Sequence, residues 1–239
     1  MTPDWRESDV AADGAPAPAR RVRVRVQAPD GLTRLLRPGG TTTVVRMGPG
    51  SDTAASEALP HARAVEVVML LASRRHRYEG RPADGAAPPQ PGEQELRDRI
   101  ELRAGLGIVG DRYFAARAHV HASVTVIGVE GLEQAGRELG APIDLASTRR
   151  NVFLRGVDVE ALRGVPFSLD TGDGPVLFRG YRPANPCAWM DTEVAPGAFR
   201  AMRGHGGVRC DPESDGVLTL GTAVLRTADP VPAADVGAD

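Results

Sequence analysis

The sequence predicts a mainly β protein with a few short helices, an α+β chain built around one barrel or sandwich core. Three observations support this prediction. Hydrophobic residues make up 41% of the 239 residues, which is enough for one substantial core. The second half of the chain is a succession of short apolar segments separated by turn residues, as in all-β folds. Repeated strand–helix–strand units are not visible, which disfavours a parallel α/β sheet.

The first residues predict an N-terminal extension, residues 1–60, partly disordered and with one or two strands. Residues 1–20 are rich in Pro, Ala, Gly and Asp, a composition typical of disorder. Arg21–Gln27 reads RVRVRVQ, the alternation of a strand with one basic face. We interpret that face as solvated, with phosphate contact as the alternative. Gly48–Pro60 has the composition of a linker.

The main domain is predicted over residues 61–227, and residues 228–239 form an acidic, proline-bearing tail that we expect to be disordered. Val65–Ser73 is the first strongly apolar strand, and a Pro/Gly-rich loop follows it. Glu95–Arg103 is a short polar strand or helix. Val124–Val129 alternates as a strand, and Glu130–Leu139 is a short helix that a glycine ends.

The remaining elements are short strands, interrupted by one helical stretch at Pro196–Met202. The predicted strands are Asn151–Arg155, Val165–Leu169, Val176–Tyr181, Val208–Cys210, Val217–Leu220 and Ala223–Thr227.

Composition excludes several classes of function. The formal net charge of −2 does not suggest a nucleic-acid or membrane partner, and no apolar run approaches the roughly 18 residues of a membrane span. The N-terminus has no apolar signal-peptide core, so we expect a cytoplasmic protein. The chain contains no lysine, which excludes a pyridoxal phosphate Schiff base and a P-loop lysine. Two cysteines make neither a disulfide framework nor a four-cysteine zinc site.

Gly105, Gly107 and Gly110 spell G-x-G-x-x-G, the outline of a dinucleotide-binding turn. The preceding segment RIELR is too charged for a strand that is buried on both faces, and Asp111 would repel a pyrophosphate. We therefore favour a tight turn whose glycines adopt positive φ. A turn whose backbone N–H groups bind an anion is the alternative.

Arg182–Asp191 reads RPANPCAWMD and contains the candidate reactive residue, Cys187. The prolines on either side of Asn185 stiffen the approach, so the loop can present the thiol to solvent. Asn185 can hydrogen-bond backbone groups in the turn. Cys210 lies on a predicted strand, where we expect a packed core thiol.

A second candidate element is Thr148–Val152, TRRNV, at the entrance of a strand. Paired arginines can bind a phosphate in a bidentate manner, and Asn151 offers a donor and an acceptor to the edge of a heterocyclic ring. A surface ion pair and a turn asparagine would also explain this pattern. A thiol, two arginines, an amide and a glycine turn together suit an anionic cofactor that carries a transition metal.

These motifs, in this order, resemble a stand-alone member of the MOSC family. The family is named for the C-terminal domain of molybdenum-cofactor sulfurases. The resemblance covers about residues 62–227 and rests on AGLGIVGDR, ASVTVIGVE, TRRNVFLRGVDVEAL, NPCAWMD, HGGVRC and DGVLTLG. It implies a MOSC-type β-barrel that binds the molybdenum cofactor, with Cys187 as the molybdenum ligand and catalytic residue. It further implies cofactor-binding roles for Arg149, Arg150, Asn151, Gly110, Asp111, Ser123 and Asn185.

Some members of the family reduce N-hydroxylated compounds with electrons from separate redox proteins. The resemblance therefore implies a molybdenum-dependent oxidoreductase that acts on a small molecule. Two alternatives stay open: a sulfur or cofactor carrier with a persulfide on Cys187, and a non-catalytic degenerate binding module. Pyridoxal phosphate is not expected as a cofactor. The chain lacks the lysine that some members use, a formed N-terminal barrel module and a ferredoxin-like cysteine set, so an electron donor would be another protein.

Overall fold

The computed structural model describes residues 58–235, and within them seven strands close into a barrel. In barrel order these are β1 (His61–Leu70), β10 (Gly221–Thr227), β6 (Pro166–Asp170), β7 (Pro175–Pro183), β8 (Val208–Pro212), β4 (Val124–Gly128) and β5 (Val152–Arg155). All neighbours are antiparallel except β4 and β5. The predicted fold class, mainly β with few short helices, is confirmed, and the architecture matches a MOSC-type barrel.

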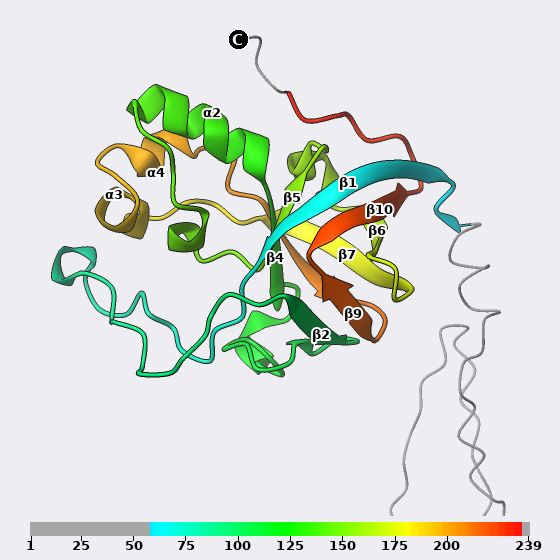
Figure 1. Ribbon diagram of the computed structural model, residues 1–239, viewed down its shortest axis with the longest axis horizontal. Coiled ribbons are helices and arrows are strands. Elements are labelled where there is room, and N and C mark those ends of the chain that lie inside the picture. The colour runs from blue at the N-terminus through cyan, green and yellow to red at the C-terminus, as the bar shows by residue number, and fades with distance from the viewer. Residues whose placement is uncertain (1–57, 236–239) are drawn as a thin grey trace, which may run out of the picture. The chain divides into compact units, whose positions relative to one another are not determined.

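A three-stranded sheet and short helices complete the described part of the chain. The sheet is antiparallel in the order β3 (Gly107–Ile108), β2 (Arg99–Arg103) and β9 (Gly216–Thr219). The α-helices are α2 (Val129–Leu139), α3 (Trp189–Glu193) and α4 (Ala198–Ala201), which gather on one side of the barrel (Figure 1). The 3-10 helices are η1 (Pro82–Asp84), η2 (Arg117–His119), η3 (Leu145–Thr148) and η4 (Val159–Leu162).

The barrel interior is filled by alternate residues of its strands. On β4, Val124 and Val126 join the interior core, so the side chains between them face outward. Phe167 and Phe178 stack inside with ring centroids 5.2 Å apart. Full burial of a side chain of this size contributes roughly 1.5–3 kcal/mol. Cys210 is fully buried in the same core, as the sequence predicts.

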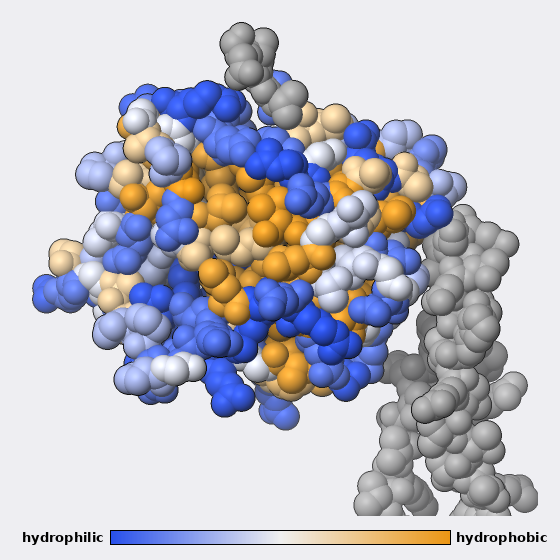
Figure 2. Space-filling view, in the orientation of Figure 1, coloured by the Kyte–Doolittle hydropathy of each residue, from blue (hydrophilic) through white to orange (hydrophobic). Residues whose placement is uncertain are grey.

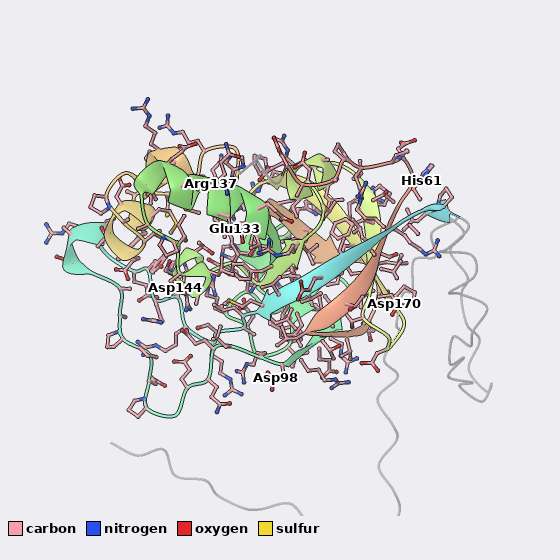
Figure 3. The ribbon with its side chains drawn as sticks, turned by 45° about the horizontal axis from the view of Figure 1, so that its top comes forward. His61, Asp98, Glu133, Arg137, Asp144 and Asp170 are labelled. Atoms are coloured by element: carbon pink, nitrogen blue, oxygen red, sulfur yellow. The ribbon has the colours of Figure 1, made fainter. Side chains whose placement is uncertain are left out.

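A second core lies outside the barrel wall, where the helices cover it. Ile127 and Phe153 face outward from β4 and β5 and pack against Leu132 of α2. Glu133 and Arg137 lie on the exposed side of this helix (Figure 3). The helices thus cover one part of the outer wall, and the part beside them carries the polar side chains described below.

Most predicted elements are present, with small shifts at their ends. The predicted helix 130–139 is α2, which begins at Val129. The first apolar strand belongs to β1, which already begins at His61. The segment 95–103, which the sequence left open as strand or helix, contains β2. The short helix α3 has no counterpart among the predicted elements.

Gly105 lies in the turn between β2 and β3, Gly107 begins β3, and Gly110 lies in the turn after it, so the three glycines do not form a dinucleotide-binding motif. Gly105, Gly107 and Gly110 have φ values of 67°, 99° and 82°, which glycine adopts without strain. No α-helix begins at this turn, because a further turn and η2 follow Gly110. The predicted positive φ is confirmed, but the glycines belong to two turns on either side of β3 and not to one tight turn.

The predicted N-terminal strand Arg21–Gln27 and the rest of residues 1–57 lie outside the described residues. The predicted boundaries at residues 60 and 227 and the disordered tail stay predictions. Residues 228–235 have neither helix nor strand, and their backbone oxygens accept hydrogen bonds from the barrel domain: Arg63 to Val231 at 2.9 Å and the Asp158 N–H to Pro232 at 3.1 Å. In residues 58–235 no helix is long and apolar enough to cross a bilayer.

Candidate functional site

Cys187 lies on the loop that connects β7 to α3, and its side chain is exposed. The loop is fixed at both ends. The Ala184 N–H donates to the Gly207 carbonyl at 2.7 Å, and the Met190 N–H donates to the Cys187 carbonyl at 2.9 Å. Asn185 is also exposed. The loop therefore presents the thiol to solvent, as its two prolines suggest, while its backbone is anchored.

Arg150 anchors this loop through hydrogen bonds to backbone carbonyls. Its guanidinium donates to the carbonyls of Gly206 at 2.9 Å, Ala184 at 2.7 Å, Thr148 at 3.2 Å and Asn185 at 3.3 Å. No carboxylate within residues 58–235 forms an ion pair with it. Burial lowers the pKa of Arg150 to about 10, so it is still protonated at neutral pH, and a charge on Cys187 partly offsets this shift.

The close approach beside Arg150 depends on Gly206. A Cβ atom at this position would lie 2.4 Å from the Ala184 carbonyl oxygen, closer than side-chain carbons come to backbone atoms. Any larger residue would therefore displace the start of the Cys187 loop.

Arg149 is neutralised inside the protein. Its guanidinium makes a bidentate ion pair with Glu95, at 2.6 and 2.7 Å, and the residue is buried. Glu95 also accepts from the Ser73 hydroxyl at 2.6 Å and from Arg77 at 2.8 Å. Burial opposes ionisation of Glu95, but these hydrogen bonds outweigh it and lower its pKa to about 2. The charge that the sequence assigns to a cofactor phosphate already has a partner here.

Asn151 joins three segments through all of its hydrogen-bonding positions. Its Oδ1 accepts from the Thr125 N–H at 3.0 Å and from the Thr125 hydroxyl at 2.9 Å. Its Nδ2 donates to the Leu71 carbonyl at 3.0 Å and to Asp111 at 3.3 Å. The side chain is 1% exposed. Asn151 therefore fixes the ends of β1, β4 and the glycine turn relative to one another.

Asp111 and Ser123 are buried in the same way. Asp111, after Gly110, accepts from the N–H groups of Ser73 at 3.1 Å and Tyr113 at 3.0 Å. Ser123 donates its hydroxyl to Asp211 at 2.7 Å. We call Asp111, Ser123 and Asn151 the buried frame. The frame supports the site from within, and contacts between its side chains and a cofactor stay a prediction.

Several arginines that the sequence did not assign to cofactor binding lie near Arg150. Arg182 of β7 and Arg209 of β8 are register partners, and Arg209 is also paired with Thr125 of β4. Arg209 and Arg112 lower the pKa of Arg150 after burial does, which indicates that these cations lie within electrostatic range of each other. Alternation in the segment VRC could have placed Arg209 on the outer face, but only the register reveals its neighbours.

Aromatic and imidazole rings border this arginine group. Tyr78 stacks on Trp189 with ring centroids 5.0 Å apart, next to the Cys187 loop, and its hydroxyl donates to the Ser147 carbonyl. Tyr113 lies between His76, at 6.1 Å, and His119, at 3.9 Å. Burial and then Arg112 lower the pKa of His76, and burial and then Arg209 lower the pKa of His119. Both imidazoles are therefore neutral at neutral pH.

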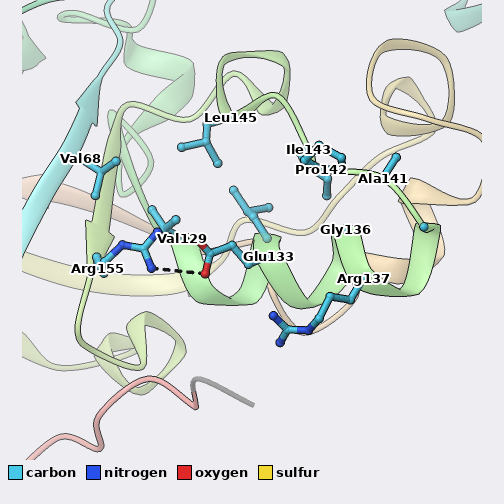
Figure 4. A pocket seen from close by; sticks show the side chains of 12 residues that line it. Val68, Val129, Glu133, Gly136, Arg137, Ala141, Pro142, Ile143, Leu145 and Arg155 are labelled. Carbon is cyan, nitrogen blue, oxygen red and sulfur yellow. Dashed lines mark hydrogen bonds and ion pairs between the residues drawn. The ribbon is translucent and has the colours of Figure 1, made fainter. Parts of the chain in front are cut away.

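Two pockets lie away from Cys187. One of about 570 Å³ is bounded by α2, residues 140–145, Val68 and the ion pair between Glu133 and Arg155 (Figure 4). Apolar side chains gather beneath α2 in Figure 2, over this region. A second pocket of about 440 Å³ lies between the start of α2, η4 and residues 232–235. Neither is lined by Cys187 or the arginines around it. The exposed thiol and these arginines, and not a pocket, therefore identify the candidate site.

Solved structures of similar fold were found at low sequence identity. The YUAD protein from Bacillus subtilis is 15% identical, with a TM-score of 0.53, over 70% of this chain and 98% of that chain. YiiM from Escherichia coli is 14% identical, with a TM-score of 0.43, over 72% and 73% of the two chains. YiiM from Geobacillus stearothermophilus is 17% identical, with a TM-score of 0.39, over 45% and 55%.

No family model matches the sequence, and no curated protein matches it. At 15% identity, the likeness to the YUAD protein is one of fold alone. Among residues 58–235, no three His, Cys, Asp or Glu side chains are grouped so as to hold a metal ion.

Proposed function

We propose that this chain binds the molybdenum cofactor on the surface around Cys187 and reduces small N-hydroxylated substrates with electrons from a separate protein. The main support is the exposed thiol of Cys187 next to the protonated guanidinium of Arg150, which has only carbonyl partners. A thiolate is a ligand that suits a transition metal, and guanidinium groups suit phosphate. The residues around Cys187 therefore fit an anionic cofactor that carries a metal.

Exposed residues would contact the cofactor, and buried residues would hold the strands beneath it in place. Cys187 would be the molybdenum ligand, and Asn185 is exposed beside it for contact with the cofactor. Arg150 holds the loop by its carbonyls, and its charge attracts a thiolate on Cys187. The buried frame and the pair of Arg149 with Glu95 keep β1, β4 and β5 in place beneath the site. When bound, the cofactor would supply two-electron removal of oxygen from the substrate.

A reduction assay tests this proposal. The protein would be purified from a host that makes the cofactor and given an aromatic N-hydroxyamidine, with reduced viologen as the electron source. We expect consumption of the hydroxylated compound by the wild type and at least a 100-fold loss with Cys187→Ser, within the range that removal of a catalytic group costs. Cys210→Ala is the matched control and should keep the activity. Molybdenum-loaded wild type without any reduction would contradict the reductase.

A carrier of sulfur is the second candidate, because the exposure of Cys187 and the charge of Arg150 also suit an anionic persulfide. Intact mass spectrometry of cofactor-free protein separates the two. The carrier predicts a species heavier by one sulfur atom that a thiol reductant and Cys187→Ser both remove. The reductase predicts the unmodified mass.

A further inference from the structure

We infer that an anion of the phosphate class binds between Arg182 and Arg209, on neighbouring strands of the barrel and next to Arg150. The inference rests on the proposed function in one respect: the cofactor's phosphate would be the anion that occupies this subsite. The sequence assigns that role to Arg149, whose guanidinium Glu95 already occupies.

The register of the barrel brings the two arginines together. Val208 and Cys210 belong to the interior core, so Arg209 between them faces outward. Arg182 is its partner on β7, across a register shift after Gly180. Residues directly opposite each other in an antiparallel pair have Cβ atoms about 4.5–5.5 Å apart, and like charges in that position destabilise a sheet. An anion bound between the two guanidiniums would offset their repulsion.

The neighbouring carboxylates make their hydrogen bonds and ion pairs with groups other than Arg182 and Arg209. Asp211 accepts from the His121 N–H at 2.8 Å and from the Ser123 hydroxyl at 2.7 Å. Asp111 is bound inside the buried frame and pairs with Arg112 at 3.5 Å. Glu213 pairs with Arg179 at 2.7 Å. In the described part of the chain, no ion pair includes Arg182 or Arg209.

The neighbouring arginines also favour binding of an anion. Arg209 and Arg112 both disfavour the charge on Arg150, and Arg209, Arg112 and Arg182 all disfavour a charge on His119. Arg112 pairs with Asp111 at 3.5 Å, whereas Arg150, Arg182 and Arg209 form no ion pair within residues 58–235 and raise the positive potential of one surface. Arg150 is held in place by four carbonyls. A guanidinium binds phosphate oxygens in a bidentate manner, so a tetrahedral oxyanion fits two facing arginines.

Arg179 offers a matched control on the same strand. It lies three residues before Arg182 on β7, but it faces Asp211 in the register and forms an exposed ion pair with Glu213. Its replacement removes one positive charge from β7 without touching Arg182 or Arg209. A general effect of net charge would appear in Arg179→Ala, and a specific anion site would not.

The test titrates full-length protein from a host without the cofactor with inorganic phosphate and then pyrophosphate, followed by isothermal calorimetry and 31P NMR. We expect binding to the wild type and to Arg179→Ala, and weakening of at least about tenfold in the double variant R182A/R209A. The variant R182K/R209K should recover part of the affinity, because it keeps the charge and loses the bidentate geometry. The melting temperature of each variant reports on the fold.

Molybdenum content of the same variants from a cofactor-producing host separates this inference from the proposed function. Loss of phosphate binding in the double variant, with no molybdenum even in the wild type, would keep the anion site and reject the cofactor. Molybdenum and phosphate bound equally by wild type and double variant would reject the anion site and keep the cofactor. Absence of phosphate and pyrophosphate binding to the wild type would also overturn the anion site.

Discussion

The inside of the barrel and the outer wall beside Cys187 are built from the same strands, but the inside is apolar and the outer wall is polar. On β8, Val208 and Cys210 point into an apolar core, while Arg209 between them faces the surface that also carries Arg150 and Arg182. On β4, Val124 and Val126 are core residues, and Thr125 between them binds Asn151. One face of each strand thus stabilises the fold, which leaves the other face available for polar chemistry.

The two regions also differ in how their polar groups are satisfied. Beneath the wall, the buried frame and the pair of Arg149 with Glu95 have internal partners for their donors and acceptors. At the surface, Arg182 and Arg209 have no ion-pair partner in residues 58–235. Satisfied polar groups hold a structure together, whereas a group of like charges raises the local potential and attracts ligands of opposite charge.

Breaking the interior core should give the largest loss of stability. Phe178→Ala removes one ring of the stacked pair inside the barrel and leaves a cavity, so we expect a loss of about 3–5 kcal/mol in the free energy of unfolding. Denaturant unfolding measures this. Arg182→Ala, at an exposed position, serves as the comparison and should change stability by less than about 0.5 kcal/mol. Equal losses would contradict the division between core and surface.

Breaking the buried ion pair of Arg149 with Glu95 should give the second-largest loss of stability. The pKa of Glu95 falls from 4.5 to about 2 in the folded chain, so the ionised carboxylate contributes about 3 kcal/mol above pH 4.5. Because the folded pKa is depressed, this contribution is lost as the pH falls from 4.5 toward 2. Glu95→Gln should therefore be less stable than the wild type at pH 7 and nearly equal to it near pH 2. A difference independent of pH would contradict the ion-pair assignment.

A smaller effect should come from Glu160, whose Oε1 accepts from the Gly207 N–H at 2.7 Å. Burial raises the pKa of Glu160. Because the folded pKa is raised, the protonated form is favoured in the fold, and stability relative to Glu160→Gln should fall as the pH rises through that pKa. Thermal unfolding of both proteins at pH 4 and pH 7 measures the change. A wild type that gains stability over the variant as the pH rises would reverse the sign and contradict this prediction.

The sequence predicts much of the fold because period-two alternation and a helix stop at Gly140 are local signals. It does not predict closure of the barrel, in which β1 pairs with β5 and β10, because register depends on distant residues. It misses α3, whose five residues are too few for a period to be visible.

The site was predictable to a similar extent. The exposure of Cys187 follows from its proline-flanked loop. The neutralisation of Arg149 by Glu95 does not, because 54 residues separate the two and no motif joins them. The meeting of Arg182 with Arg209 likewise depends on strand register. Local chemistry therefore identifies the candidate residue, and tertiary pairing decides which arginines remain available to a ligand.

The molybdenum content per chain, measured by mass spectrometry of the metal, tests a cofactor site at Cys187 most directly. Wild type, Cys187→Ser and Cys210→Ala would be purified side by side from a host that makes the cofactor. We expect molybdenum in the wild type and in Cys210→Ala, and its loss from Cys187→Ser with an unchanged melting temperature. Equal molybdenum in all three proteins, or none in any of them when the same host loads a known molybdenum protein, would contradict a cofactor site at Cys187.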